Sequence, residues 1–295
     1  LRAMRVAQFV SRLGFHVQND LEDMCVEADL ASLPGERLNE EWRKLLLGAN
    51  PDSGLWFVHG TMLRHFPELA ALRHCEQDKE WHPEGDVFVH TAMALRQARL
   101  LTDDQTVLWA TLLHDAGKPS TTTKDEDGRI RSKGHEDAGV QPATAFMERL
   151  RAPINLTCRV AALVATHLAP AHFVPEPGSG TSKAGPSAYR RLARRLGAAG
   201  TDLQTLYLVS KADHFGRTTE DAIERRFPAG DEFLRRAQDI KVTDKPEPDV
   251  VMGRHLLARG HQPGPEIGRI LERCREFQYE TGAKDPDMIL SEVLK

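Results

Sequence analysis

One stretch of the sequence constrains the fold more than any other. Residues 108–113 form an apolar run that ends in the adjacent pair His114 and Asp115, and Gly-Lys-Pro follows at 117–119. An apolar run that stops at glycine and proline predicts a buried helix. A histidine and a carboxylate buried side by side destabilise a fold unless a partner satisfies them. A divalent metal ion is the simplest partner, because it accepts both donor types and the negative end of the helix dipole favours a cation. The plain alternative is an aspartate and a half-buried histidine at a helix end.

Composition narrows the class of protein. The chain has 295 residues, of which 40% are hydrophobic, enough to bury a core in one large domain or two smaller ones. The net charge of −4 excludes a uniformly basic nucleic-acid binder but allows a local basic patch. No apolar run approaches a membrane span, the N-terminus carries no secretory signal, and the four cysteines form no Cys-x-x-Cys pair. We therefore expect a soluble cytoplasmic protein with reduced thiols and no membrane partner.

Helical periodicity predicts an all-α fold in three segments. Residues 1–75 show apolar faces of helical spacing, interrupted by glycine and proline, which predicts a helical neck or body. A polar connector at 71–85 ends in His-Pro-Glu-Gly and indicates a domain boundary. Residues 82–240 predict a helical bundle, and residues 241–295 predict a linker with a C-terminal helical segment. Because the chain begins inside a predicted helix and lacks an initiator methionine, we expect a fragment or a processed chain.

The later part of the chain contains several helical patterns and one exception. The predicted helices cover residues 86–101, 134–150, 154–167, 187–197, 201–215 and 266–279. Pro142 is expected to kink the second of these or to delay its start. One small β-hairpin is expected between residues 120 and 132, because Asp127 and Gly128 are typical of a tight turn. A stretch rich in proline, glycine and serine at 175–186 predicts a flexible loop.

Further histidines and aspartates near predicted helix ends supply candidate metal ligands. A lone buried histidine is more often a satisfied core residue than a ligand, so the joint pattern carries the argument. The candidate ligands are His90, His114, Asp115, Asp213, His135 and His167. Mixed imidazole and carboxylate ligands suit a divalent ion such as Mn, Fe, Co, Ni, Zn or Mg. Four protein ligands leave coordination positions for water and substrate, as a catalytic site requires.

The order His, His-Asp, Asp resembles the HD-domain metal-dependent phosphohydrolases. On that resemblance His90, His114, Asp115 and Asp213 are the four metal ligands. The resemblance also implies that His135 and His167 are the extra ligands of members that bind two ions, with Asp115 as the bridge. Lys118 matches a phosphate-contacting lysine, and His172 is a weaker candidate. One ion and two ions both remain open.

A narrower resemblance covers essentially the whole chain. Residues 1–15, 35–38, 44–46, 65–69 and the Ala-Asp-x-x-Gly-Arg element at 212–217 look like parts of the bacterial tRNA nucleotidyltransferases, the family of CCA-adding enzymes and poly(A) polymerases. A Pro-Gly-Pro element at 263–265 is similar to one near their C-terminus. Their nucleotidyltransferase head, with a Gly-Ser pair and paired aspartates, has no match in this sequence. The chain as written is therefore not expected to polymerise nucleotides.

The leading hypothesis is metal-dependent hydrolysis of phosphoesters, with Asp115 and Lys118 as catalytic residues. The resemblance implies 2′,3′-cyclic phosphodiesterase, 2′-nucleotidase and phosphatase activity on nucleotides or RNA ends. The alternative is the tRNA-binding body and HD part of a tRNA nucleotidyltransferase, a protein of tRNA processing. A basic helix face supplies the candidate RNA contacts Arg190, Arg191, Arg194 and Arg195. For these four residues a solvated helix face is the competing interpretation, and a nucleoside triphosphate or cyclic dinucleotide substrate finds no particular support.

Overall fold

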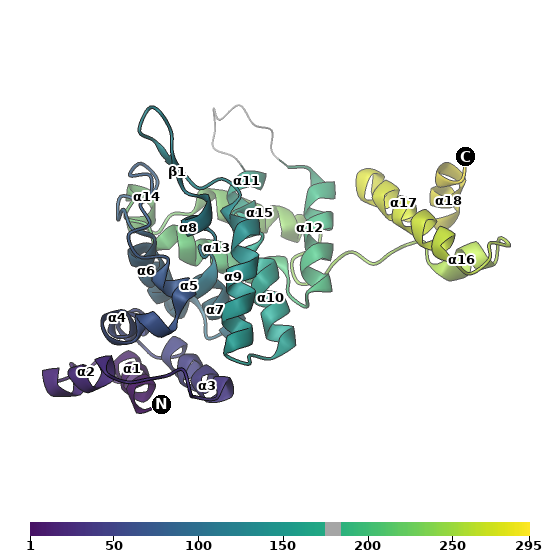
Figure 1. Cartoon of the computed structure of the whole chain (residues 1–295). Coiled ribbons are helices and arrows are strands. Elements are labelled where there is room, and N and C mark those ends of the chain that lie inside the picture. The colour runs from purple at the N-terminus through teal and green to yellow at the C-terminus, as the bar shows by residue number, and fades with distance from the viewer. Residues whose placement is uncertain (175–183) are drawn as a thin grey trace.

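The fold is helical, as the sequence predicts. A computed structural model describes residues 1–174 and 184–295, and these residues form helices and one two-stranded hairpin (Figure 1). The flexible loop predicted at 175–186 lies largely outside the described residues. The N-terminal helices are α1 (Arg2–Leu13), α2 (Asn19–Val26), α3 (Gly35–Leu46), α4 (Pro51–Thr61), the 3₁₀ turn Leu63–His65 and α5 (Pro67–Ala70). The helices of the central bundle are α6 (Val87–Leu101), α7 (Gln105–Leu113), α8 (Lys118–Thr121), α9 (His135–Arg149), α10 (Ile154–Val164), α11 (Ala169–Phe173), α12 (Pro186–Ala198), α13 (Leu203–Phe215), α14 (Glu220–Ile223) and α15 (Pro228–Asp239).

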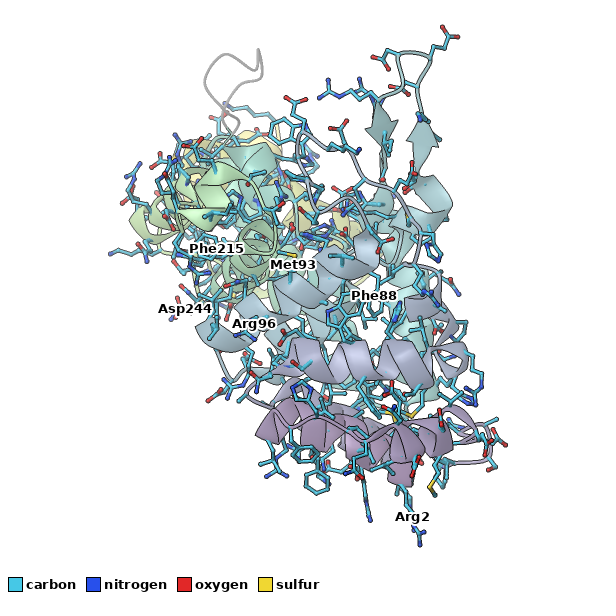
Figure 2. All side chains as sticks on the ribbon, turned by 90° about the vertical axis from the view of Figure 1, so that its left-hand side faces the viewer. Arg2, Phe88, Met93, Arg96, Phe215 and Asp244 are labelled. Atoms are coloured by element: carbon cyan, nitrogen blue, oxygen red, sulfur yellow. The ribbon has the colours of Figure 1, made fainter. Side chains whose placement is uncertain are left out.

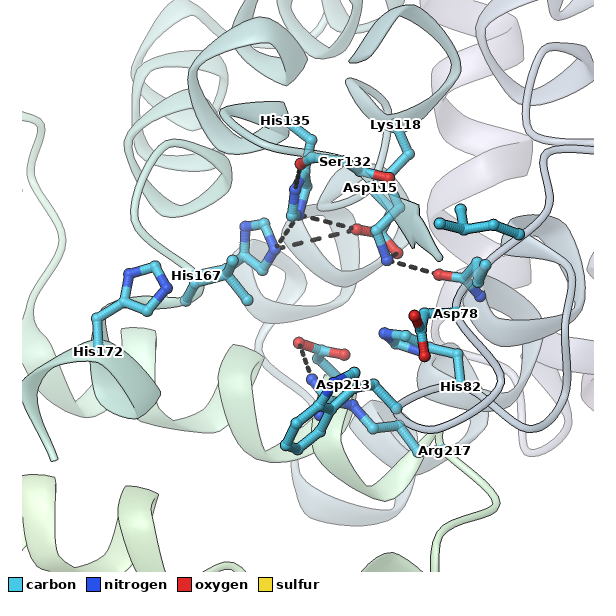
Figure 3. Close-up of a pocket in the computed structure, with 14 residues that line it drawn as sticks. Asp78, His82, Asp115, Lys118, Ser132, His135, His167, His172, Asp213 and Arg217 are labelled. Carbon is cyan, nitrogen blue, oxygen red and sulfur yellow. Dashed lines mark hydrogen bonds and ion pairs between the residues drawn. The ribbon is translucent and has the colours of Figure 1, made fainter. Parts of the chain in front are cut away.

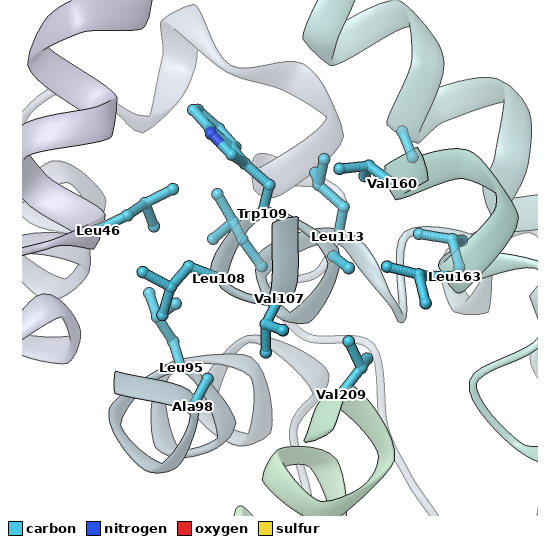
Figure 4. Packing of buried hydrophobic residues seen from close by; sticks show 14 of the residues in the cluster. Leu46, Leu95, Ala98, Val107, Leu108, Trp109, Leu113, Val160, Leu163 and Val209 are labelled. Atoms are coloured by element: carbon cyan, nitrogen blue, oxygen red, sulfur yellow. The ribbon is translucent and has the colours of Figure 1, made fainter. Parts of the chain in front are cut away.

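Helix α7 is the centre of the bundle. Its residues from Thr106 to Leu113 are all buried, and α6, α10 and α13 pack around it (Figure 4). A short helix that is apolar on every side can only lie in a core, which confirms the buried helix predicted from the apolar run. The helix ends at Leu113, so the next two residues, His114 and Asp115, lie inside the bundle.

The N-terminal helices share a continuous apolar core with the bundle. Trp42 of α3 makes an edge contact with Phe66, at 5.1 Å between ring centroids, and another with Phe146 of α9 at 5.8 Å. Helix α4 lies between α1 and α6, and Phe88 is at the contact between α4 and α6 (Figure 2). Contacts between these large buried rings hold residues 1–75 against the bundle. The predicted division of the chain near residue 80 stays a prediction.

Two local predictions have different outcomes. The hairpin is confirmed: strands β1 (Thr123–Lys124) and β2 (Ile130–Arg131) pair antiparallel, and Gly128 has the positive φ of 82° that its turn requires. Of the two effects predicted for Pro142, a delayed helix start is wrong, and a kink stays a prediction. Helix α9 begins at His135 and continues through Pro142.

The C-terminal segment has a small core of its own. It comprises α16 (Gly253–Leu257), α17 (Pro265–Thr281) and α18 (Pro286–Val293). These helices lie to one side of the bundle, beside α12 (Figure 1), and bury residues such as Leu256 and Ile289 among themselves. The pattern analysis missed α18, although Asp285 caps it and Pro286 occupies its first position, both typical of a helix start. Among the described helices, none is long and apolar enough to cross a membrane.

Candidate metal centre

The six predicted ligands come together at one end of the bundle. His90 projects from α6, Asp213 from α13, and the remaining four lie at or just beyond helix ends. Figure 3 shows Asp115, His135, His167 and Asp213 of this set. None of the six residues is more than 6% exposed: His90, His114, Asp115, His135, His167 and Asp213. The ends of α7, α9 and α10 meet here because these helices pack side by side around the same core.

Asp115 lies between two groups of histidines. Its Oδ2 is 3.2 Å from Nε2 of His114 and 3.9 Å from Nε2 of His90. Its Oδ1 is 3.4 Å from Nε2 of His135 and 4.0 Å from Nε2 of His167. The two carboxylate oxygens therefore face different imidazole pairs, and these residues form two sets of potential metal ligands with Asp115 in common.

Asp213 completes the first set. Its Oδ1 lies 3.0 Å from Nε2 of His90 and 3.8 Å from Nε2 of His114. On the outer side, the guanidinium of Arg217 lies 3.6 Å from Oδ2 of the same carboxylate. Asp213 is thus held between the histidines and one arginine at the edge of the site.

Hydrogen bonds to backbone carbonyls orient three of the imidazoles. Nδ1 of His114 donates to Thr111 at 2.7 Å, Nδ1 of His135 to Ser132 at 2.7 Å, and Nδ1 of His167 to Val164 at 2.8 Å. A proton on Nδ1 leaves Nε2 as the free lone pair that faces the centre of the cluster. This second contact is the arrangement that metal-binding histidines usually have.

Two buried atoms of the cluster have no hydrogen-bond partner among the described residues. They are Nε2 of His114 and Oδ1 of Asp115, whereas Oδ2 of Asp115 forms an ion pair with Nζ of Lys118 at 2.7 Å. Leaving such groups unsatisfied in a core costs on the order of 1–3 kcal/mol each. Divalent cations bound at the cluster would satisfy these atoms, so the residues present fit a metal ion. Imidazole and carboxylate donors together suit a divalent ion.

Burial and neighbouring charges shift the pKa values of groups in the cluster. Burial opposes ionisation of Asp115, but the charges of His114 and Lys118 hold the pKa of this carboxyl well below its usual range. Burial lowers the pKa of the His167 imidazole to about 3, and it also lowers the pKa of His135. Asp115 is therefore an anion, and both histidines facing its Oδ1 are neutral near pH 7, as metal ligands must be.

Glu84 contacts the candidate site, and the pattern analysis missed it. The connector at 71–85 was predicted to be a boundary, whereas its end folds onto the site. Nδ1 of His90 lies 2.8 Å from Oε1 of Glu84, and Nδ1 of His82 lies 2.9 Å from the same oxygen. Burial opposes ionisation of Glu84, but the hydrogen bonds from the two histidines lower the pKa of this carboxyl. Periodicity carries no signal for such a contact, because Glu84 lies in a loop.

A cavity of about 370 Å³ opens onto the cluster. Asp115, His135, His167 and Asp213 form its floor (Figure 3). The other lining residues are Gln77, Asp78, Trp81, His82, Lys118, Ile130, Ser132, Leu168, His172 and Arg217. The volume is in the range of small-ligand sites, and a substrate in it would lie against the candidate ligands.

Lys118 is buried at the wall of this cavity. Its Nζ lies 2.7 Å from Oδ2 of Asp115 and donates to Oε1 of Gln77 at 2.6 Å. His172, the weaker candidate, lines the cavity but belongs to neither ligand set. The cavity therefore combines a buried ammonium group with the imidazole cluster.

The four arginines predicted to contact RNA lie on α12, away from this cavity. Arg190 pairs with Glu247 at 2.7 Å, Arg191 with Glu276 at 2.6 Å, and Arg194 with Asp249 at 3.0 Å. Arg195 is exposed. Three of the four thus contact carboxylates of the C-terminal segment, and RNA binding by this face stays a prediction.

Known proteins are similar to this chain both within one domain and over most of its length. A family model described as HD domain matches residues 87–248. A multifunctional CCA protein of Xanthomonas campestris pv. campestris (strain B100) is 32% identical over 286 residues, which cover 93% of this chain and 65% of that protein. A multifunctional CCA protein of Alkalilimnicola ehrlichii is 32% identical over 86% of this chain and 60% of its own length.

A solved structure described as a complex of a CCA-adding enzyme with CTP has the same fold. It matches with a TM-score of 0.50 and 16% identity, over 99% of this chain and 59% of that protein. The chain thus spans about 60–65% of the length of these relatives.

Proposed function

Because the chain belongs to the HD-domain family and is related over almost its whole length to multifunctional CCA proteins, as its motifs predict, we propose that it is a metal-dependent phosphohydrolase. Its substrates on this proposal are nucleotide or RNA-end phosphoesters: 2′,3′-cyclic phosphodiesters, 2′-monoesters and related phosphate esters. One observation carries the proposal. The buried carboxylate of Asp115, whose Oδ1 has no hydrogen-bond partner in the described residues, lies between two pairs of imidazoles beneath an open cavity.

Each group of the site has a role in this reaction. His90, His114, Asp115 and Asp213 would hold one divalent ion, and Asp115, His135 and His167 would hold a second. Bound there, a divalent ion lowers the pKa of a water molecule and polarises phosphoryl oxygens. The carboxylate of Asp115 orients the attacking water, and the ammonium of Lys118 neutralises the charge that develops on the phosphoryl group.

Phosphate release tests the proposal. Adenosine 2′,3′-cyclic phosphate and adenosine 2′-monophosphate are incubated with the protein in the presence of Ni, Mn, Co or Mg. Asp115→Ala should abolish turnover, whereas the control Asp103→Ala, which alters a carboxylate that is 78% exposed, should leave it unchanged. Full activity in Asp115→Ala, or no activity of the parent protein with any of these metals, would reject the function.

A second candidate function is tRNA binding, with hydrolysis secondary. It rests on the relatives named multifunctional CCA protein and on the arginines of α12. A gel-shift titration with tRNA at two salt concentrations tests it, because phosphate contacts weaken steeply as salt increases. Tight, salt-sensitive binding would support this role, and no binding at low salt would remove it.

A further inference from the structure

A single loop contributes five residues to the site. Gln77 donates its backbone N–H to the carbonyl of Gly85 at 2.9 Å, so the two ends of the 77–85 loop lie together. At one end Glu84 holds His90 of the metal cluster, and on the outside Arg129 of the hairpin pairs with Asp78 at 3.3 Å. Gln77, Asp78, Trp81 and His82 of this loop all line the cavity. The loop is therefore fixed at several points and presents a set of side chains to any ligand.

Gln77 has an unused donor beside the phosphate-binding lysine. Its Oε1 must face Lys118, because an ammonium group can only donate. The opposite end of the amide, Nε2, is buried and has no partner within the described part of the chain. Gln77 is 4% exposed and lines the cavity. A ligand oxygen next to Lys118, such as a phosphoryl oxygen, would satisfy this N–H donor.

Trp81 gives the same cavity an aromatic surface. It is 43% exposed although it is one of the largest apolar side chains of the protein. Ile130 and Leu168 add further apolar surface to the cavity wall. The turn that carries Trp81 is fixed by two hydrogen bonds. The Asp78 carboxylate accepts from the backbone N–H of Glu80 at 2.9 Å, and the Asp78 carbonyl accepts from the backbone N–H of His82 at 2.8 Å. Phosphate alone would use none of this apolar surface, whereas a nucleoside phosphate would.

From these contacts we infer that the 77–85 loop makes the site selective for nucleotides: the Gln77 amide donates to the phosphoryl group beside Lys118, and the Trp81 indole stacks on the base. This inference rests on the proposed phosphohydrolase function and specifies its substrate class. Stacking on an aromatic ring tolerates any base, because every base has a π face. The loop therefore discriminates nucleotides from other phosphate esters without selecting one base.

The test of Trp81 compares two substrates that share a phosphomonoester. Adenosine 2′-monophosphate carries a base, and glycerol 2-phosphate carries none. Trp81→Ala should raise KM for the nucleotide about tenfold and leave KM for glycerol 2-phosphate unchanged. Trp81→Phe keeps a ring and should stay within about threefold of the parent protein. Trp56→Ala is the matched control, because Trp56 is 42% exposed and lies on α4 outside the cavity.

A binding measurement separates this inference from the hydrolytic function. Equilibrium dialysis of adenosine 2′-monophosphate against the metal-free protein needs no turnover and should show the same tenfold loss in Trp81→Ala. Equal changes in KM for both substrates would overturn the role of Trp81. So would an unchanged nucleotide affinity, or a parent protein that binds the nucleotide no better than glycerol 2-phosphate. If no phosphoester is hydrolysed but the dialysis result holds, only the proposed reaction fails.

Gln77 has its own pair of variants. Gln77→Leu should raise KM for both substrates about five- to tenfold, because the phosphoryl contact is common to them. Gln77→Glu keeps the acceptor for Lys118, loses the donor and adds a negative charge, so it should impair both substrates at least as much. Parent-like KM values for both substrates in Gln77→Leu would overturn the phosphoryl contact.

Discussion

Nδ1 of His90 lies 2.8 Å from Oε1 of Glu84, and this contact links a buried imidazole of α6 to a loop outside the bundle. The other oxygen of the carboxylate accepts from the backbone N–H of Thr218 at 3.2 Å. Glu84 is thereby held at both oxygens and fixes the orientation of His90, with Nε2 directed at Asp213. A carboxylate behind an imidazole is the usual outer partner of a metal-binding histidine.

Glu84→Ala should therefore weaken binding of the first metal ion about 10- to 100-fold, because His90 loses the partner that orients it. Glu84→Gln keeps one acceptor oxygen, so its metal affinity should lie between those of Glu84→Ala and the parent protein. Isothermal titration with Mn or Zn measures the affinity. Glu80→Ala, which removes a carboxylate of the same loop that is 65% exposed, is the control. Parent-like affinity in Glu84→Ala would show that the contact is only structural.

Asp115→Asn should abolish the thermal stabilisation that a divalent ion confers. The amide has nearly the same shape as the carboxylate but lacks the charge that both ligand sets share. In the parent protein, an ion at 100 times its dissociation constant should add about 2.7 kcal/mol of stability, and a chelator should remove this gain. Thermal melting with added Mn, and then with excess chelator, measures the effect. An equal rise of the melting temperature in Asp115→Asn would place the ion elsewhere.

Acid should destabilise the metal-free protein between pH 6.5 and pH 5. Burial lowers the pKa of His167 in the fold to about 3 from an ordinary value of 6.5. The unfolded chain therefore binds more protons in this interval, and stability present above pH 6.5 is lost as the pH falls. For one such histidine the loss by pH 5 is about 2 kcal/mol at most.

Urea unfolding at the two pH values measures this loss, with His167→Asn as the test variant and the exposed His16→Asn as its control. The test variant should show a smaller difference between the two pH values than the parent protein, and the control should match the parent. A pH dependence that survives unchanged in His167→Asn would assign it to other groups.

Asp249→Ala should loosen the C-terminal segment without affecting the cavity. Asp249 accepts two hydrogen bonds from Arg275, at 2.9 and 3.0 Å, and one from Arg194 of α12 at 3.0 Å. Because Asp249 is partly exposed, the loss should be only about 1 kcal/mol. Limited proteolysis in the linker at 241–252 should become several-fold faster. Asp239→Ala, which breaks an exposed pair with Arg235, is the control. Equal cleavage rates in the two variants would show that the pairs to Asp249 do not hold the segment.

The sequence by itself determined the helical class and the candidate ligands of the centre. The apolar run before His114 predicted a core helix, so the His-Asp pair at its end was expected to be buried and to need a partner. Asp127 and Gly128 located the hairpin, because the turn depends on local φ and ψ preferences. Each of these inferences uses interactions between residues close in sequence, which periodicity and residue type express directly.

Only the tertiary structure decided which of these side chains contact one another. It brought Glu84 to His90 and Gln77 to Lys118, although these residues lie in a loop with no periodic pattern. It also placed carboxylates of the C-terminal segment against the arginine face of α12, which the sequence alone presents as an open basic patch. The physical reason differs between these contacts. Gln77 and Lys118 are far apart in the chain, as are the arginines of α12 and their carboxylate partners. Glu84 is close to His90 in sequence but lies in a loop, where side chains are positioned by the elements on which they pack.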